Sequence, residues 1–64
     1  MIKINGAQFE LNGTTIGDYI KQSHFDPKTI AVEINEEIVP KSLYDNTVLK
    51  DGDTVEIVNF VGGG

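Results

Sequence analysis

The sequence predicts an α+β fold, in which one mixed sheet of four to five strands carries one main helix across one face. Three observations predict it. Apolar and polar residues alternate with period two near both ends, one central stretch has helical spacing, and Asn-Gly and Asp-Gly turn signals border the strands. The chain has 64 residues, of which 39% are hydrophobic, enough for one small domain with a single core.

The first predicted element is a hairpin. Residues 1–4 and 8–11 both alternate apolar and polar, and Asn5-Gly6 between them tolerates the positive φ of a tight turn. Alternation then puts four side chains on one face of this hairpin: Ile2, Ile4, Phe9 and Leu11.

A helix is predicted next. Thr15 can accept a hydrogen bond from a free N–H of the first turn, with Asp18 three residues on as a capping partner. One helical stripe follows, made of Ile16, Tyr19 and Ile20. Gly17 lowers helix propensity, so this helix needs to pack against the sheet, and Asp26-Pro27 is expected to end it.

The second half of the chain predicts three more strands, over residues 30–34, 38–40 and 54–61. The second of these is short and edge-like because Pro40 cannot donate to a ladder. Between it and the last strand we expect an irregular connection over 41–46, whose Leu43 and Tyr44 fill the core, and then a glycine turn at residues 50–53. With the first and last strands parallel in the middle of the sheet, this order is the β-grasp arrangement.

Composition argues against several functions. Five lysines against ten acids give a net charge of −5, which disfavours nucleic acid and anionic membranes as partners. The apolar runs are too short to span a bilayer, and no basic leader with an apolar stretch opens the chain, so we expect a cytoplasmic monomer. The absence of cysteine excludes disulfides and thiolate metal sites.

Catalysis by the chain's own side chains is not expected, and neither is a metal site. The one histidine, His24, follows the predicted helix and is interpreted as a solvated residue favoured by the helix dipole. Asp51-Gly52-Asp53 lacks the ligand spacing of a calcium loop and is interpreted as a turn that enters a strand.

The sequence ends in Gly62-Gly63-Gly64, a run with a chance of roughly one in three thousand at average glycine usage. Residues 1–60 are therefore predicted to form the folded domain and residues 61–64 a flexible glycine tail. A glycine thread fits a narrow active site, and a terminal carboxylate without a side chain is open to attack once it is activated, for example by adenylation. A frayed end or a cloning scar is the alternative.

These features together resemble the ThiS family, the sulfur carriers of thiamine (thiazole) biosynthesis within the ubiquitin-like β-grasp superfamily. The segments that carry the resemblance are Asn5-Gly6, Ile38-Val39-Pro40, Asp51-Gly52-Asp53 with Val55-Glu56-Ile57, and the glycine end. The resemblance implies that a ThiF-like, E1-like enzyme adenylates Gly64 with ATP, with no cofactor bound to the carrier. Sulfur from a cysteine desulfurase or a related donor then forms a thiocarboxylate, which a ThiG-like thiazole synthase uses.

In this comparison Gly62 and Gly63 thread the partner's active site. The family usually ends in two glycines and this chain in three, so either the extra residue shifts the reactive position or Gly64 is a variant terminus. The residues expected to dock a partner are Val58, Phe60 and Val61, on or beside the open face of the sheet, although Phe60 folded over the sheet edge is an equal alternative. We also expect the acids near that end to favour a basic partner, namely Asp45, Asp51, Asp53 and Glu56.

Three alternative functions remain open at this point. The small subunit of molybdopterin synthase shares the fold and the tail chemistry, but tends to carry a proline pair that Asn59-Phe60-Val61 lacks. A ubiquitin-like modifier would be joined through Gly64 to lysines of other proteins. A plain binding module would not use its tail at all.

Overall fold

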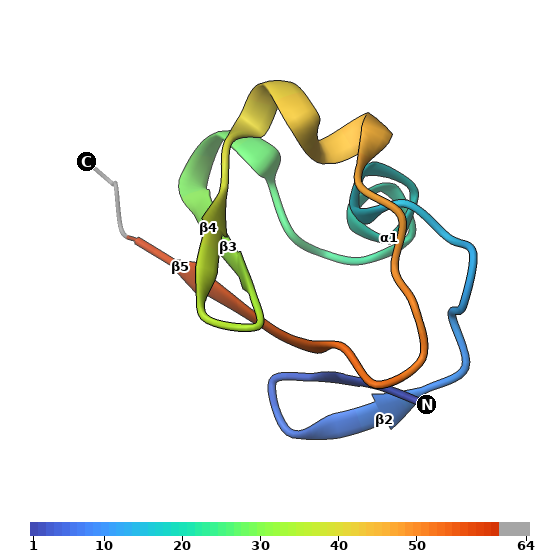
Figure 1. Ribbon diagram of the computed structural model, residues 1–64. Coiled ribbons are helices and arrows are strands. Elements are labelled where there is room, and N and C mark those ends of the chain that lie inside the picture. Colours follow the sequence, from blue (N-terminus) through green and yellow to red (C-terminus); the bar gives the residue numbers. More distant parts are fainter. Residues whose placement is uncertain (61–64) are drawn as a thin grey trace.

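The computed structural model describes residues 1–60, which form a five-stranded mixed sheet with a short α-helix packed against one face (Figure 1). The strands are β1 (Ile2–Ile4), β2 (Ala7–Phe9), β3 (Ile30–Ile34), β4 (Glu37–Val39) and β5 (Thr54–Asn59). The helices are α1 (Ile16–Gln22) and two 3₁₀ helices, η1 (Pro27–Thr29) and η2 (Lys41–Asn46).

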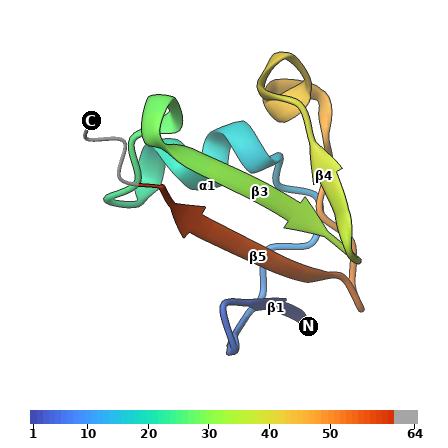
Figure 2. The same cartoon turned by 90° about the vertical axis from the view of Figure 1, so that its left-hand side faces the viewer.

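The middle of the sheet is a parallel pair made by the first and last strands. The strand order is β2-β1-β5-β3-β4, and β1 runs parallel to β5 with Ile4 opposite Val55. On its other side β5 pairs antiparallel with β3 over five residues, so the last strand is flanked on both sides (Figure 2). The predicted α+β fold and its β-grasp arrangement are confirmed.

Both hairpins have two-residue turns, which moves two strands from their predicted bounds. The turn at Asn5-Gly6 sets Ile4 opposite Ala7, so β2 begins at residue 7. It ends at Phe9, which lies opposite Ile2, the first residue of β1. The second turn, at residues 35 and 36, likewise starts β4 at residue 37. Leu11, predicted in a strand, instead follows β2 and packs against the core.

The last strand is shorter than predicted for a similar reason. It pairs with β3 as far as Asn59, which lies opposite Ile30, the first residue of β3. Beyond that point the Phe60 N–H makes one further ladder-like bond, to the Thr29 carbonyl at 2.9 Å, within the described residues. The remaining residue of the predicted strand, Val61, lies outside the described residues.

Helix α1 begins as predicted and ends earlier. The Asp18 N–H donates to Thr15 Oγ1 at 3.1 Å, which confirms Thr15 as the N-cap. The helix stops at Gln22 because Ser23 leaves helical geometry, with its N–H and its hydroxyl both donating to the Ile20 carbonyl. Asp26-Pro27, predicted to end this helix, instead begins η1, where the Asp26 carboxylate caps the Lys28 N–H.

The core lies between α1, η2 and the sheet. Among residues 1–60 its buried hydrophobic residues are Ile2, Ile4, Ile16, Ile20, Ile30, Val32, Tyr44, Leu49, Val55 and Ile57. Of the two residues predicted to fill the core from the connection, Tyr44 is 6% exposed but Leu43 is 47% exposed. The connection is a 3₁₀ helix, so adjacent side chains point about 120° apart and only one of the pair faces inward.

Two asparagines attach the hairpin turns to β5. Both adopt positive φ, 50° at Asn5 and 53° at Asn35, which suits tight turns. The Asn5 side chain donates from Nδ2 to the Ile57 carbonyl at 3.1 Å and accepts from the Ile57 N–H at 2.8 Å. The Asn35 side chain donates to Asp53 and accepts from the Thr54 N–H, both at 3.0 Å. Each carboxamide therefore adds two side-chain hydrogen bonds to the backbone hydrogen bonds that pair the strands.

Candidate functional site: the open sheet face and the base of the glycine run

The face of β5 that points away from α1 is exposed. Val55 and Ile57 point into the core, whereas Glu56 and Val58 alternate onto the opposite face. Val58 is 58% exposed and Phe60 is 48% exposed, so these two of the three expected docking residues are accessible at the end of β5 that leads to the glycine run. Their exposure agrees with the sequence analysis, and their role in docking stays a prediction.

Phe60 is the last described residue, and it contacts segments that are distant from it in the sequence. It is not among the partly buried apolar residues packed against the core. Instead, the Lys41 ammonium lies 5.7 Å from the centroid of its ring. Beside it, Thr29 Oγ1 donates to Asn59 Oδ1 at 3.1 Å. Segments around residues 29, 41 and 60 thus meet at the end of β5, two residues before Gly62, and this place is called the base of the glycine run.

The expectation that several acids gather near this end is wrong for Asp51 and Asp53. Both precede β5, whereas Phe60 follows it, so a strand length of about 20 Å separates them. Asp45 lies in η2 against Gly17 of α1. The predicted strand over residues 54–61 itself separates these acids from the glycine run, because they precede the strand and the glycines follow it.

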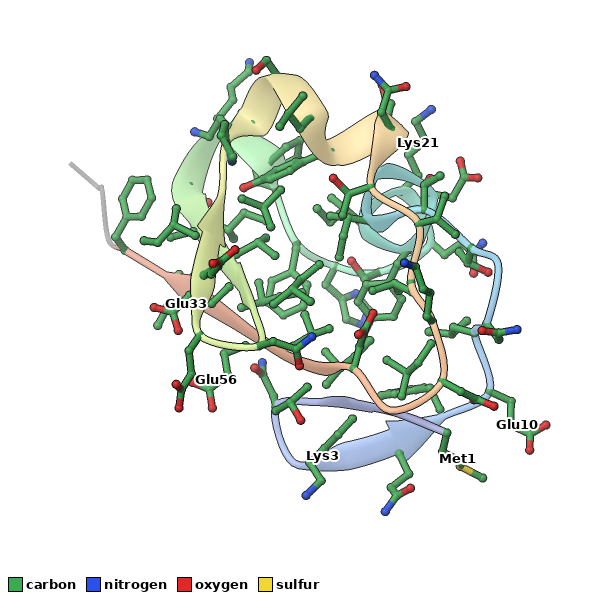
Figure 3. The ribbon with its side chains drawn as sticks, viewed as in Figure 1. Met1, Lys3, Glu10, Lys21, Glu33 and Glu56 are labelled. Carbon is green, nitrogen blue, oxygen red and sulfur yellow. The ribbon has the colours of Figure 1, made fainter. Side chains whose placement is uncertain are left out.

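The fourth predicted acid, Glu56, lies on the open face beside acids that were not predicted. Glu33 of β3 and Glu56 of β5 are directly opposite each other, and both project away from the helices (Figure 3). They border a polar hollow of about 550 Å³, lined by Glu33, Asn35, Glu36, Thr54 and Glu56. The hollow lies toward the start of β5, where Asn35 bonds to Asp53 and Thr54, so an acidic surface there would attract a basic partner at the end of β5 away from the glycine run.

The described residues offer little catalytic chemistry of their own. His24 is exposed beyond the end of α1, as the sequence analysis expected. Asp53 accepts hydrogen bonds from the Lys50 N–H and from Asn35, so it stabilises a turn in which Gly52 has φ 93°. Burial raises the pKa of Tyr44 above its usual value of 10.0.

Metal-ligand clusters and long apolar helices are both absent from residues 1–60. Within this range no three His, Cys, Asp or Glu side chains are grouped so that they could hold a metal ion. No helix in the same range is long and apolar enough to cross a membrane.

The predicted reactive residues, Gly62, Gly63 and Gly64, lie outside the described residues together with Val61. Conversely, the contacts of Lys41 and Thr29 at the base of the run were not expected from the sequence. Lys41 is 19 residues from Phe60 and Thr29 is 31 residues away, and no local pattern links such distant positions.

Comparison with known proteins extends the similarity over the whole chain. The sequence model of the ThiS family matches residues 2–64. The chain is 38% identical to the sulfur carrier protein ThiS of Bacillus subtilis, over 100% of each chain. It also resembles the crystal structure of a thiamine biosynthesis protein (ThiS) from Geobacter metallireducens, with a TM-score of 0.78, 28% identity, and coverage of 98% of this chain and 97% of that one.

Part of a larger enzyme is also similar. The chain is 42% identical to a thiazole synthase of Paramagnetospirillum magneticum over 95% of its own length, but spans only 19% of that enzyme. The full-length matches, by contrast, are to proteins of this size and fold. From its sequence and its sheet topology alike, this chain belongs to the ThiS family.

Proposed function

We propose that this chain carries sulfur as a thiocarboxylate on Gly64 and delivers it for thiazole formation in thiamine biosynthesis. The observation that supports the proposal most is the similarity to a sulfur carrier protein over the full length of both chains. The run Gly62-Gly63-Gly64 supplies a slim segment that an active site can enclose, ending in a carbon without a side chain.

The proposed chemistry has two steps. In an E1-like adenylating enzyme, a carboxylate oxygen of Gly64 attacks the α-phosphorus of ATP and pyrophosphate leaves, which gives an acyl adenylate. A hydrosulfide equivalent then attacks the carbonyl carbon, and AMP leaves with the electrons of the broken C–O bond. A cysteine desulfurase or a related donor is the proposed source of sulfur. Because such a donor delivers sulfur as a persulfide, a thiol reductant supplies the two electrons that bring this sulfur to the hydrosulfide level, and the thiol is oxidised to a disulfide.

In this proposal the chain is a protein co-substrate rather than an enzyme. The partner consumes ATP, no cofactor is bound to the carrier, and the carrier works as a monomer in the cytoplasm, where its partners are. Thiazole synthase is the proposed acceptor of the sulfur. Two thiazole synthases contain a segment similar to this chain over about a fifth of their length, 19% and 20%, which supports a direct association between the two functions.

The proposed docking surface consists of Val58, Phe60 and Val61. The exposure of Val58 and Phe60 on or beside the open sheet face supports it, since apolar side chains near the reactive end can be buried by a partner. The acidic pair Glu33 and Glu56 on the same face favours a partner surface that carries basic residues.

The test is alkylation of the activated carrier. The chain is incubated with ATP, hydrosulfide and an E1-like adenylating enzyme, then treated with a thiol-alkylating reagent and analysed by intact mass and peptide mapping. Because the chain contains no cysteine, rapid alkylation of the C-terminal peptide marks a thiocarboxylate. We expect one adduct per chain, dependent on ATP and absent when Gly63 and Gly64 are deleted.

The outcome against the proposal is equally specific. If the enzyme activates the Bacillus subtilis carrier in the same tube but leaves this chain without an adduct, sulfur carriage on Gly64 is wrong. Adducts in which Gly64 is joined to lysines of other proteins would indicate a modifier instead.

A further inference from the structure

The base of the glycine run is fixed by groups from two other parts of the chain. The Phe60 N–H donates to the Thr29 carbonyl at 2.9 Å, which holds the backbone where β5 has ended. The ring of Phe60 lies beneath the Lys41 ammonium, 5.7 Å from its centroid. An aromatic face attracts a cation at such a distance, so backbone and side chain are both restrained.

Lys41 is itself restrained. Its Nζ donates to the Lys28 carbonyl at 3.3 Å, and its backbone opens η2 directly after Pro40. A long lysine side chain in water samples many rotamers, but here the ammonium has two attractive partners in different segments. The contact therefore links η1, η2 and the end of β5.

We propose that Lys41 is a positioning residue: through the ring of Phe60 it holds the end of β5, from which the chain continues to the glycine run, in place before any partner binds. This inference rests on the proposed function. It goes beyond that function because it gives a task to a residue that is predicted neither to react nor to touch the activated carboxylate.

The physical reason is preorganisation. A partner that must insert the glycine run into its active site loses less conformational entropy if Phe60, two residues before the run, is already held. Once the complex has formed, the partner holds that segment itself, and Lys41 has no further effect on the chemical step. Loss of the contact should accordingly raise KM and leave kcat unchanged.

The size of the effect follows from the strength of an exposed cation–π contact. Its removal should raise the KM of the carrier about two- to fivefold. Lys41→Met removes the cation while keeping an unbranched apolar chain of similar length. Lys41→Arg retains a cation and N–H donors, so it should restore the KM of the parent chain.

Lys28→Met is the matched control. It removes one positive charge from the same end of the molecule, but Lys28 accepts the bond from Lys41 through its backbone carbonyl, which the substitution preserves. A general change in electrostatic attraction to the partner would affect both variants alike. A loss of positioning would affect only Lys41→Met.

The assay follows pyrophosphate release by an E1-like adenylating enzyme over a range of carrier concentrations. Proton NMR of the same proteins reports the contact directly, because the ring current of Phe60 shifts the ε-methylene protons of Lys41 upfield. We expect that shift to vanish in Phe60→Leu, and the KM to rise in Lys41→Met but not in Lys28→Met or Lys41→Arg.

Two results would overturn the inference while leaving sulfur carriage intact: equal KM values for Lys41→Met and Lys28→Met, or a fall in kcat at constant KM. The proposed function, and with it the inference, would be refuted if an enzyme that is active on the Bacillus subtilis carrier releases no pyrophosphate with the parent chain.

Discussion

Replacing Asn5 tests how strongly the first hairpin is attached to β5. The Asn5 carboxamide makes two partly buried hydrogen bonds to Ile57, at 3.1 Å from Nδ2 and 2.8 Å to Oδ1. The same residue has a φ of 50°, a conformation that glycine adopts without strain and alanine does not. Asn5→Gly and Asn5→Ala therefore separate the loss of two bonds from the strain of the turn.

The expected magnitudes follow from these contacts. Each hydrogen bond contributes about 1 kcal/mol, so Asn5→Gly should lower the free energy of unfolding by about 2 kcal/mol. Asn5→Ala should lower it by about 3 kcal/mol, because an L side chain in the left-handed region adds about 1 kcal/mol. A domain of this size has a total stability of about 3–10 kcal/mol, and 2 kcal/mol corresponds to a fall in Tm of about 8–16 °C.

Urea denaturation followed by circular dichroism measures both variants, with unchanged m-values as a check that unfolding stays two-state. Asn35→Gly is the matched control, since Asn35 also has positive φ but its two hydrogen bonds are exposed. It should cost less than about 1 kcal/mol. If Asn5→Gly costs no more than Asn35→Gly, the Asn5 carboxamide does not stabilise the central pair of strands.

Gly17→Ala should destabilise the fold by about 1–3 kcal/mol in thermal melts, because a Cβ there meets the Asp45 Cα at 3.2 Å. Alanine has the better helix propensity, so a more stable variant would refute this packing argument. Burial raises the pKa of Tyr44, so its contribution to stability is complete below about pH 10 and declines as the pH rises further. Melting temperatures of Tyr44→Phe should fall less steeply over that range, and parallel curves would contradict the assignment. Deleting Gly63 and Gly64 should abolish the alkylated adduct but leave Tm unchanged, since glycine has no side chain to bury and the core found within residues 1–60 lies between Ile2 and Ile57. A large fall in Tm would contradict this.

Much of the fold could be predicted because local signals agreed with the topology. Asn5-Gly6 forms the expected tight turn, Thr15 caps the helix, and Pro40 follows the last residue of an edge strand. Strand and helix ends were predicted less well because they depend on partners. β2 stops where β1 stops, and α1 stops where Ser23 bonds back to Ile20, neither of which is visible in residue periodicity.

The candidate site, too, could be predicted from the sequence only in part. Alternation along β5 predicted the exposure of Val58 opposite the buried Val55 and Ile57, whereas for Phe60 it left exposure and folding over the sheet edge as equal alternatives. The contact of Lys41 with Phe60 could not be predicted, because it depends on where η2 crosses the sheet end. Likewise, Leu43 and Tyr44 are both apolar neighbours, and only the geometry of a 3₁₀ turn decides which one faces the core.

The central position of β5 has a mechanical consequence for a domain that is held by its C-terminal end. A pull along β5 loads its ladders with β1 and β3 in shear, because hydrogen bonds run across the strand and must all be strained together. An edge strand pulled sideways would instead lose its rungs one at a time, as in unzipping. A partner that draws in the glycine run therefore pulls against the most resistant part of the sheet, and the domain can move as one rigid handle.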